Sequence, residues 1–232
     1  MLSVRKGHER GHSYHGWLDS YHSFSFSNYY DPEHSGFSKL LVINDDRIAP
    51  GAGFATHSHR DMEIITYVLE GALEHKDSLG TGSVIRPGEV QLMSAGTGIS
   101  HSEYNASATE PVHLLQIWIE PNQLGVKPRY QQERFPLEEL QGHLRLVVSP
   151  DGREQSLMMH QDAFMYAGQL TAGDLINYSV NGARKVYVQV ADGELNVNDQ
   201  HLVAGDGLKV LETDEIRLAT HQAAHVLLFD LP

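Results

Sequence analysis

Two short clusters of polar residues hold the side chains best suited to bind a metal ion. The first contains His57 and His59, and the second, about forty residues later, contains His101 and Glu103. Within each pair the residues are two positions apart, so on a β-strand both side chains project from one face, with Cα atoms roughly 6.5 Å apart. Two adjacent strands of this kind predict a site of three imidazoles and one carboxylate around a single ion.

The ligand types limit the metal without selecting one. Imidazole and carboxylate ligands suit Fe(II), Mn, Co, Ni, Cu and Zn, and four protein ligands leave coordination positions open for water or substrate. The chain has no cysteine, which excludes disulfides, iron–sulfur clusters and thiolate zinc sites. We expect one divalent metal per chain. Ligating imidazoles must be neutral, so metal occupancy is expected to fall as the pH drops through about 6.5.

Short β-rich runs, separated by Gly, Pro, Asp and Asn, predict the elements that position these clusters. Such a pattern is typical of an all-β sandwich or barrel. A weak internal repeat, residues 67–71 resembling 188–193, indicates two related barrels, with 121–142 as a linker that contains one short helix. The predicted domains are 1–130, which binds the metal, and 131–232. The predicted strands are 39–44, 63–69, 90–94, 113–119, 144–148, 165–170, 186–190, 208–211 and 225–231.

Composition limits the partners. Hydrophobic residues make up 41% of the 232 residues, enough for a core, and the formal net charge is −13. A surface this negative repels phosphate backbones and anionic lipid, so we expect no direct contact with nucleic acid or membrane. No apolar run has signal-peptide or membrane-spanning length, which predicts a cytoplasmic protein. Small molecules and a basic protein partner are compatible with the charge, and we expect a monomer.

The two clusters resemble the two motifs of the cupin superfamily. The first has the glycine-flanked His-x-His pattern, and the second has Gly98, His101 and Asn105 at the usual intervals. Most cupins carry their acidic ligand at the position of Ile64, whereas this chain has Glu63 one residue earlier. Because side chains alternate along a strand, that shift turns Glu63 away from the ion and favours a supporting or structural role.

In this chain the acidic ligand missing from the first motif is replaced by Glu103 in the second motif. In this arrangement the chain resembles the pirin family. The resemblance is dense over the first 120 residues and thinner beyond, and it is closest to the bacterial branch described as quercetin dioxygenases. It implies a bicupin, two antiparallel, jelly-roll-like β-barrels, with Fe(II) as the metal. The segments that carry it are 15–19, 24–26, 29–32, 42–46, 61–63, 67–71, 94–103 and 116–118.

The resemblance also implies a quercetin 2,3-dioxygenase, a metal-dependent oxidoreductase that cleaves a flavonol with dioxygen. Glu103 would then be both a ligand and the catalytic base for a substrate hydroxyl. Pirins are also described as metal- and redox-dependent regulators that bind other proteins, so a regulatory protein without physiological enzyme activity stays open. An enzyme with an unrelated natural substrate stays open too, since one barrel hosts many chemistries.

The remaining polar residues are expected to support the fold. Gln116 lies in an apolar run, where a hydrogen bond to the ligands and one to the backbone are equally compatible. The early histidines are interpreted as solvated or locally bonded rather than as lining the entrance to the site. The late histidines form no closely spaced pair, so the second barrel is expected to bind no metal. These two groups are His8, His12, His15, His22 and His34, and His160, His201, His221 and His225.

Overall fold

The computed structural model describes all 232 residues, which form two compact units. The N-terminal unit consists of Gly11–Arg134 and Met159–Gln161, and the C-terminal unit consists of Met1–Arg10, Phe135–Met158 and Asp162–Pro232. Strands dominate both units, and α1 (Leu137–Leu140) is the one α-helix. No helix is long and apolar enough to cross a membrane. The predicted all-β bicupin fold is confirmed.

The division expected from the sequence, 1–130 and 131–232, differs from these units at three places: residues 131–134, residues 1–10 and residues 159–161. Strand β12 (Arg129–Arg134) lies within the expected linker but pairs with β9 (Glu89–Ser94), so it extends the N-terminal unit. Strand β1 (Leu2–Arg5) pairs with β19 (Gly207–Val210), which joins the first ten residues to the C-terminal unit. The first two differences come from long-range strand pairing, which local sequence patterns do not reveal.

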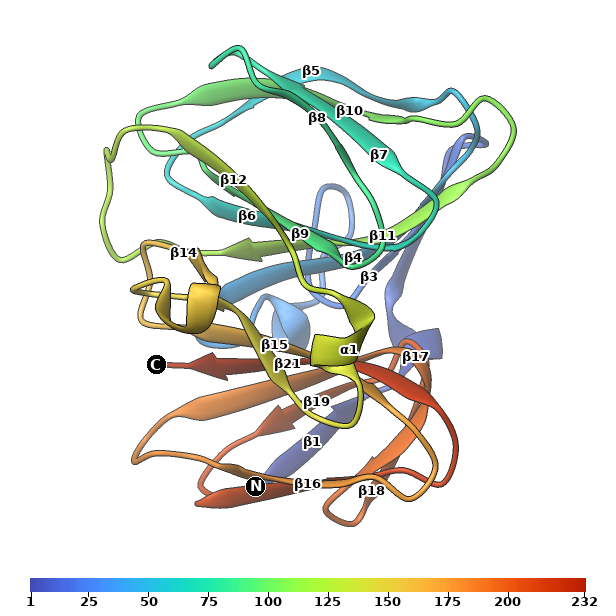
Figure 1. The fold of residues 1–232 in the computed structure, drawn as a ribbon, viewed down its shortest axis with the longest axis vertical. Helices are drawn as coiled ribbons and strands as arrows, with labels where there is room; N and C mark the ends of the chain where they lie inside the picture. Colours follow the sequence, from blue (N-terminus) through green and yellow to red (C-terminus); the bar gives the residue numbers. More distant parts are fainter. The chain divides into compact units, whose positions relative to one another are not determined.

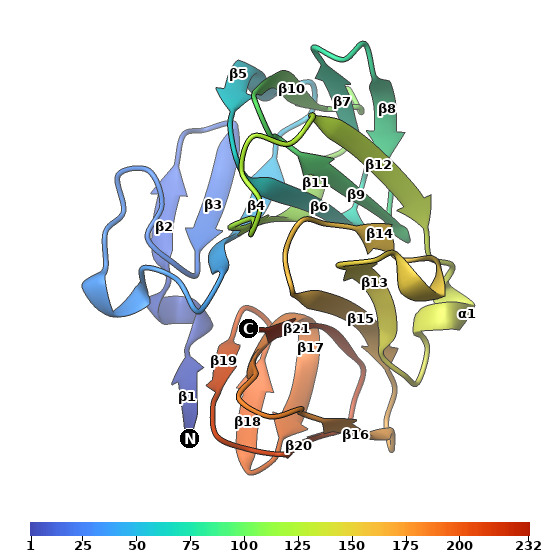
Figure 2. The ribbon, with the colours of Figure 1, turned by 90° about the vertical axis from the view of Figure 1, so that its left-hand side faces the viewer.

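Two antiparallel sheets build the N-terminal unit (Figures 1 and 2). The seven-stranded sheet has the order β12-β9-β6-β11-β4-β3-β2, and the four-stranded sheet has the order β5-β10-β7-β8. In Figure 1 the four-stranded sheet lies above the larger one, as in a closed barrel. The other strands are β2 (Gly11–Tyr14), β3 (Leu18–His22), β4 (Leu40–Ile48), β5 (Gly53–His59), β6 (Glu63–Glu70), β7 (Leu73–Asp77), β8 (Gly82–Ile85), β10 (Ile99–Asn105) and β11 (Val112–Ile119).

The inner strand β6, third in the order, shows what stabilises the larger sheet. It reads Glu-Ile-Ile-Thr-Tyr-Val-Leu-Glu, and its first six residues are buried. Strands β9 and β11 pair with its two edges, and a strand buried on both faces carries a nearly continuous apolar run rather than an alternating one. Val68 packs with Leu73, Val112 and other apolar side chains on one side, and Ile64 packs with Met93 in a separate cluster.

The C-terminal unit is a second barrel, built on the sheet order β1-β19-β17-β21-β15-β13-β14. Strands β16, β18 and β20 pair beside it and complete the sheet. Its core consists of aliphatic side chains, among them Val188, Leu208 and Val226. The strands are β13 (Arg145–Ser149), β14 (Leu157–Met158), β15 (Phe164–Leu170), β16 (Leu175–Ser179), β17 (Lys185–Val197), β18 (Gln200–Val203), β20 (Glu215–Ala219) and β21 (Ala224–Leu231).

Candidate metal centre

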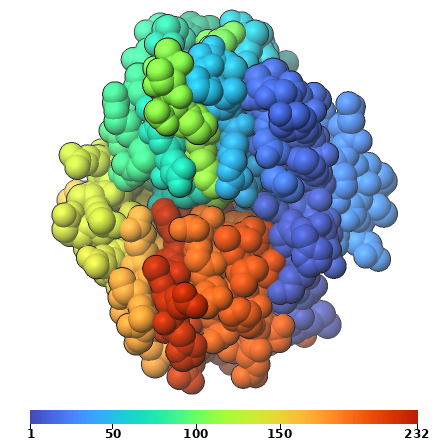
Figure 3. Space-filling model, turned by 90° about the vertical axis from the view of Figure 1, so that its right-hand side faces the viewer, coloured from blue at the N-terminus to red at the C-terminus, as the bar shows by residue number.

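Strands β5 and β10 are antiparallel neighbours, and they bring the two polar clusters together. His57 and His101 are direct cross-strand partners, and the register shifts between His101 and Glu103. The strands approach closely near Gly53, where a Cβ atom would lie 2.2 Å from the backbone oxygen of Glu103, so only glycine fits. In Figure 3 the colours of residues 50–60 and 100–110 meet at the surface.

Three imidazoles converge at this point. Nε2 of His59 lies 3.0 Å from Nε2 of His101, and the ligand atoms of His57, His59 and His101 all lie within 4.8 Å of one another. Two nitrogens that each bind a metal at about 2.1 Å, at right angles, are about 3 Å apart. The spacing of the donor atoms therefore fits a shared ion.

The hydrogen bond of His57 leaves one nitrogen free for a metal. Its Nδ1 lies 2.9 Å from the carbonyl oxygen of Ala55, which can only accept a hydrogen bond. Nδ1 therefore carries the hydrogen, and Nε2 keeps its lone pair. Such a bond to a backbone carbonyl is the usual way in which proteins orient a metal-ligating histidine.

Glu103 is buried beside these histidines. Nε2 of Gln116 donates to both of its carboxylate oxygens, at 3.2 and 3.1 Å, and the Thr66 hydroxyl donates at 3.4 Å. Of the two alternatives for Gln116, the structure therefore shows the bond to a candidate ligand. Glu103 forms a second potential ligand group with His75 and His101, so His101 belongs to both groups. Burial raises the pKa of Glu103, while its hydrogen bonds and the neighbouring histidines oppose that rise.

Burial keeps two of the imidazoles neutral. It lowers the pKa of His59 to about 4, aided by the nearby His57, and lowers the pKa of His101 to about 2. A metal ligand must offer a lone pair, and a neutral imidazole offers one. Both rings are thus in the ligating form well below pH 6.5, the value that the sequence alone suggests.

The state of His59 provides a direct test. In the metal-free protein we expect its imidazole to stay neutral at pH 6 and to gain a proton only as the pH falls through about 4. An NMR titration of histidine ring signals, with His59→Gln to assign the resonance, measures this. A midpoint near 6.5 for His59 would contradict the expectation.

A small pocket of about 60 Å³ opens beside the candidate ligands. Two of its lining residues, Asn44 and Asp46, were not predicted from the sequence to belong to the site. Burial raises the pKa of Asp46 to about 7, so a second carboxyl group near Glu103 holds a proton up to neutral pH. The Ser20 hydroxyl donates to this carboxyl group. The pocket is lined by Asn44, Asp46, Phe54, His57, His59, Ile64, Glu103, Gln116 and Trp118.

Glu63 lies outside both potential ligand groups. Its carboxylate accepts a hydrogen bond of 2.8 Å from the Ser94 hydroxyl, while the adjacent Ile64 lines the pocket. This is the arrangement that the alternation of side chains predicts. Burial raises the pKa of Glu63 to about 7, against the opposing effects of Ser94 and the charge of Arg129.

Glu63→Gln should therefore stabilise the protein in a pH-dependent way. A raised pKa means that the folded state holds its proton above the unfolded value, so the wild type loses stability as the pH rises from about 4.5 to about 7. Glutamine has no such proton to lose. The free energy of unfolding of the variant, relative to wild type, should rise by roughly 2 kcal/mol between pH 5 and pH 8. Urea unfolding at both values measures it, and a constant difference would contradict it.

His75 is the main residue that the sequence did not reveal. It is fully buried on β7, next to Asp77, and Nδ1 of His75 lies 3.4 Å from Nδ1 of His101. The sequence feature that indicates His75 is its spacing from Asp77. The two residues are two positions apart, as in the pairs His57–His59 and His101–Glu103. His22 is also buried, and its Nδ1 lies 2.8 Å from the amide oxygen of Asn44 in the pocket wall.

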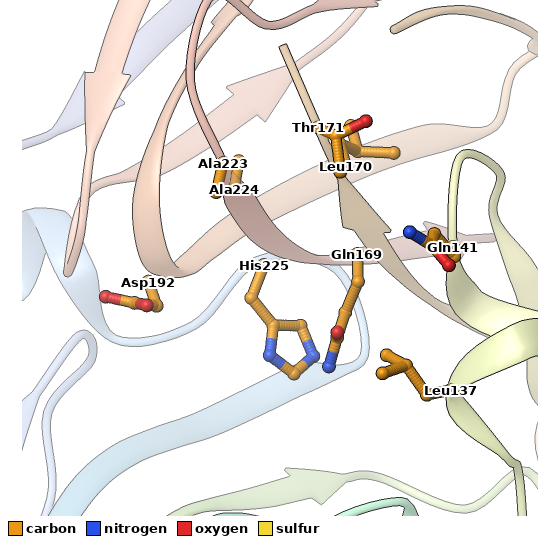
Figure 4. Close-up of a pocket in the computed structure, with 9 residues that line it drawn as sticks. All are labelled: Leu137, Gln141, Gln169, Leu170, Thr171, Asp192, Ala223, Ala224 and His225. Carbon is orange, nitrogen blue, oxygen red and sulfur yellow. The ribbon is translucent and has the colours of Figure 1, made fainter.

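The C-terminal unit contains a separate pocket of about 240 Å³ (Figure 4). Gln169, His225 and Asp192 lie in a row across β15, β21 and β17, where they are register partners. Figure 4 shows the His225 ring beside the Gln169 amide. Burial lowers the pKa of His225 to about 4, so the ring is neutral. Neither potential ligand group includes a residue of this unit, and one metal per chain stays a prediction.

Two antiparallel β-barrels, one with a His-x-His pair facing a histidine and a carboxylate on the next strand, define a bicupin. Comparison with known families shows to which family of bicupins the chain belongs. Residues 3–119 match the family model described as Pirin, and residues 146–231 match the model described as the quercetinase C-terminal cupin domain. The chain belongs to the pirin family.

Similar proteins cover the whole chain. It is 50% identical to "Quercetin 2,3-dioxygenase" of Escherichia coli K12 over 100% of this chain and 99% of that protein. It is 43% identical to "Putative quercetin 2,3-dioxygenase" of Pseudomonas aeruginosa, with complete coverage of both. The crystal structure of the bacterial pirin YhhW from E. coli in complex with nickel(II) superimposes with a TM-score of 0.96, at 50% identity, covering 100% of this chain and 99% of that one.

Proposed function

We propose that this pirin is a quercetin 2,3-dioxygenase that holds one divalent metal through His57, His59, His101 and Glu103. The observation that carries the proposal is the convergence of three imidazoles beside a buried carboxylate at a pocket. It is supported by a chain 50% identical over its full length to an E. coli protein of that name. The donor set accommodates Fe(II), our first choice from the family resemblance, and also nickel, which a 50% identical relative binds.

A bound metal would lower the pKa of a coordinated substrate hydroxyl and exchange electrons with dioxygen. In this proposal Glu103, which lines the pocket, accepts the proton of that hydroxyl. The hydrogen bonds from Gln116 and Thr66 fix the carboxylate orientation.

The pocket wall suits the edge of a planar aromatic ring. Trp118 packs against the His59 ring with centroids 5.1 Å apart, and Phe54 and Ile64 add apolar surface that excludes water from the ligands. Its volume of about 60 Å³ is below the roughly 300–1,000 Å³ usual for ligand pockets. A flavonol would therefore enter by the edge that carries the reacting hydroxyl, with the rest of the molecule outside this pocket.

Oxygen consumption with quercetin tests the proposal. Metal-free protein is reconstituted separately with Fe(II), Ni(II) and Co(II), and metal content is measured by elemental analysis with one ion per chain expected. At least one loaded form should consume dioxygen and release carbon monoxide with quercetin, but not with a flavone that lacks the hydroxyl beside the ring carbonyl. His101→Ala treated identically is the control. A fully loaded protein without oxygen consumption would reject the dioxygenase and favour the regulatory alternative.

A further inference from the structure

A buried histidine–aspartate pair lies directly behind His101. Strand β7 is the neighbour of β10, and in their register Asp77 faces His101 while His75 faces Glu103. The side chains of both His75 and Asp77 are 0% exposed. Residues two apart on a strand share a face, so the pair points to the same side of its sheet as the candidate ligands.

Backbone donors hold the Asp77 carboxylate in place. Its Oδ1 accepts hydrogen bonds from the amides of Leu79, at 2.9 Å, and Thr81, at 3.0 Å. Its Oδ2 lies 3.0 Å from Nε2 of His75. An ionised carboxylate only accepts hydrogen bonds. Nε2 of His75 therefore carries a hydrogen.

This assignment determines the hydrogen between the two rings. In a neutral His75 whose hydrogen is on Nε2, Nδ1 has a lone pair and accepts. The atom facing it, 3.4 Å away, is Nδ1 of His101, which must then donate. Its hydrogen on Nδ1 leaves Nε2 of His101 with the lone pair, at the point where Nε2 of His59 lies 3.0 Å away. The Tyr130 ring packs on His75 with centroids 4.7 Å apart and opposes its rotation.

We propose that His75 and Asp77 are positioning residues that set the tautomer of His101 so that its Nε2 faces the metal. The inference rests on the proposed metal site. Metal-ligating histidines commonly donate their second ring nitrogen directly to a carboxylate or carbonyl. Here the carboxylate acts through an intervening imidazole. Both ring nitrogens of His75 are engaged in this chain of hydrogen bonds, so we assign it no ligand role.

The decisive variant is Asp77→Asn. The backbone amides of Leu79 and Thr81 still require an acceptor, so the asparagine oxygen should take the place of Oδ1 and its NH₂ group should face His75. An NH₂ donor at this position reverses the direction of both hydrogen bonds, the one between residue 77 and His75 and the one between His75 and His101. The hydrogen moves to Nδ1 of His75, and His101 is left with its hydrogen on Nε2, where it blocks ligation. We expect the affinity for Co(II) to fall by roughly 10- to 100-fold.

Glu74→Gln is the matched control. It makes the same carboxylate-to-amide change on the same strand, but Glu74 is partly exposed and pairs with Lys76. Its Co(II) affinity should equal that of wild type. Two replacements of His75 test its hydrogen bonds. In His75→Gln the glutamine amide can donate to Asp77 and accept from His101, so it can substitute for the imidazole. In His75→Leu the side chain can do neither. We expect His75→Gln to keep Co(II) affinity within about threefold and His75→Leu to lose it as Asp77→Asn does.

Two readouts separate this inference from the proposed function. Co(II) affinity is measured by titration calorimetry, and the tautomer of His101 is read in metal-free protein from long-range proton–nitrogen NMR correlations. If the wild type binds no Co(II), the proposed metal site is wrong. The NMR spectrum of the metal-free protein would still show which ring nitrogen of His101 carries the hydrogen. A hydrogen on Nε2 of wild-type His101, or a folded Asp77→Asn with wild-type affinity, would overturn the inference. If Asp77→Asn does not fold, equal affinities of His75→Gln and His75→Leu would overturn it instead.

Discussion

Metal binding should be lost when His101 is replaced by alanine, with the N-terminal barrel still folded. His101 is the one residue shared by both potential ligand groups, and its Nε2 lies 3.0 Å from that of His59. We expect the affinity for Ni(II) or Co(II) to fall by more than about 100-fold, since a ligand loss exceeds the 10- to 100-fold typical of its supporting partners. Elemental analysis after dialysis and titration calorimetry measure the loss.

The fold should survive this change. The His101 ring is neutral in the folded protein, so its removal leaves no unpaired buried charge. The cost is a small cavity and a lost hydrogen-bond partner of His75, about 1–3 kcal/mol. Circular dichroism checks the fold, and His12→Ala, a change to an exposed histidine of the same unit, is the control. Full metal content in His101→Ala would remove the basis of the ligand assignment.

Glu103→Gln should slow turnover much more than it weakens metal binding. Glutamine keeps the shape and one potential ligand oxygen but has no basic carboxylate, so a proton transfer that contributes typically 10²- to 10⁴-fold is lost. We expect kcat with quercetin to fall within that range and the metal affinity to fall about tenfold. Steady-state oxygen consumption and calorimetry on the same preparation compare the two losses.

Glu63→Gln is the matched control for this experiment. It makes the identical change at another buried carboxylate, but Glu63 bonds to Ser94 and lies outside both potential ligand groups. It should leave kcat and metal affinity unchanged. If turnover and affinity fell by equal factors in Glu103→Gln, Glu103 would act as a ligand alone and the base would have to be sought elsewhere in the pocket, first at Asp46.

The apolar strands and the spacing of the clusters could be predicted from the sequence. Strand β6 is an almost continuous apolar run, and the pairs His57–His59 and His101–Glu103 have the spacing of two that a strand requires. That β5 and β10 are neighbours follows from the family resemblance rather than from either segment. The ligand assignment itself stays a prediction until metal binding is measured.

Polar strands could not be predicted in this way. Strand β7 reads Leu-Glu-His-Lys-Asp, with a single apolar residue, so it carries no hydrophobic alternation. Its conformation depends on pairing with β10 on one edge and β8 on the other. His75 was therefore not singled out, because its importance comes from the register that places it opposite Glu103. Strand β12 shows the same dependence on a partner, since none of its residues is fully buried.

Pairing of β1 with β19 has a consequence for biosynthesis. Leu2 and its register partner Val210 lie 208 positions apart in the sequence (210 − 2). Lys6 and the Gly7 amide likewise bond to Asp206. Contacts this distant in sequence make folding slow. The C-terminal barrel cannot be completed during translation until β19 has been synthesised, and until then the β1 segment lacks its strand partner and is available to chaperones.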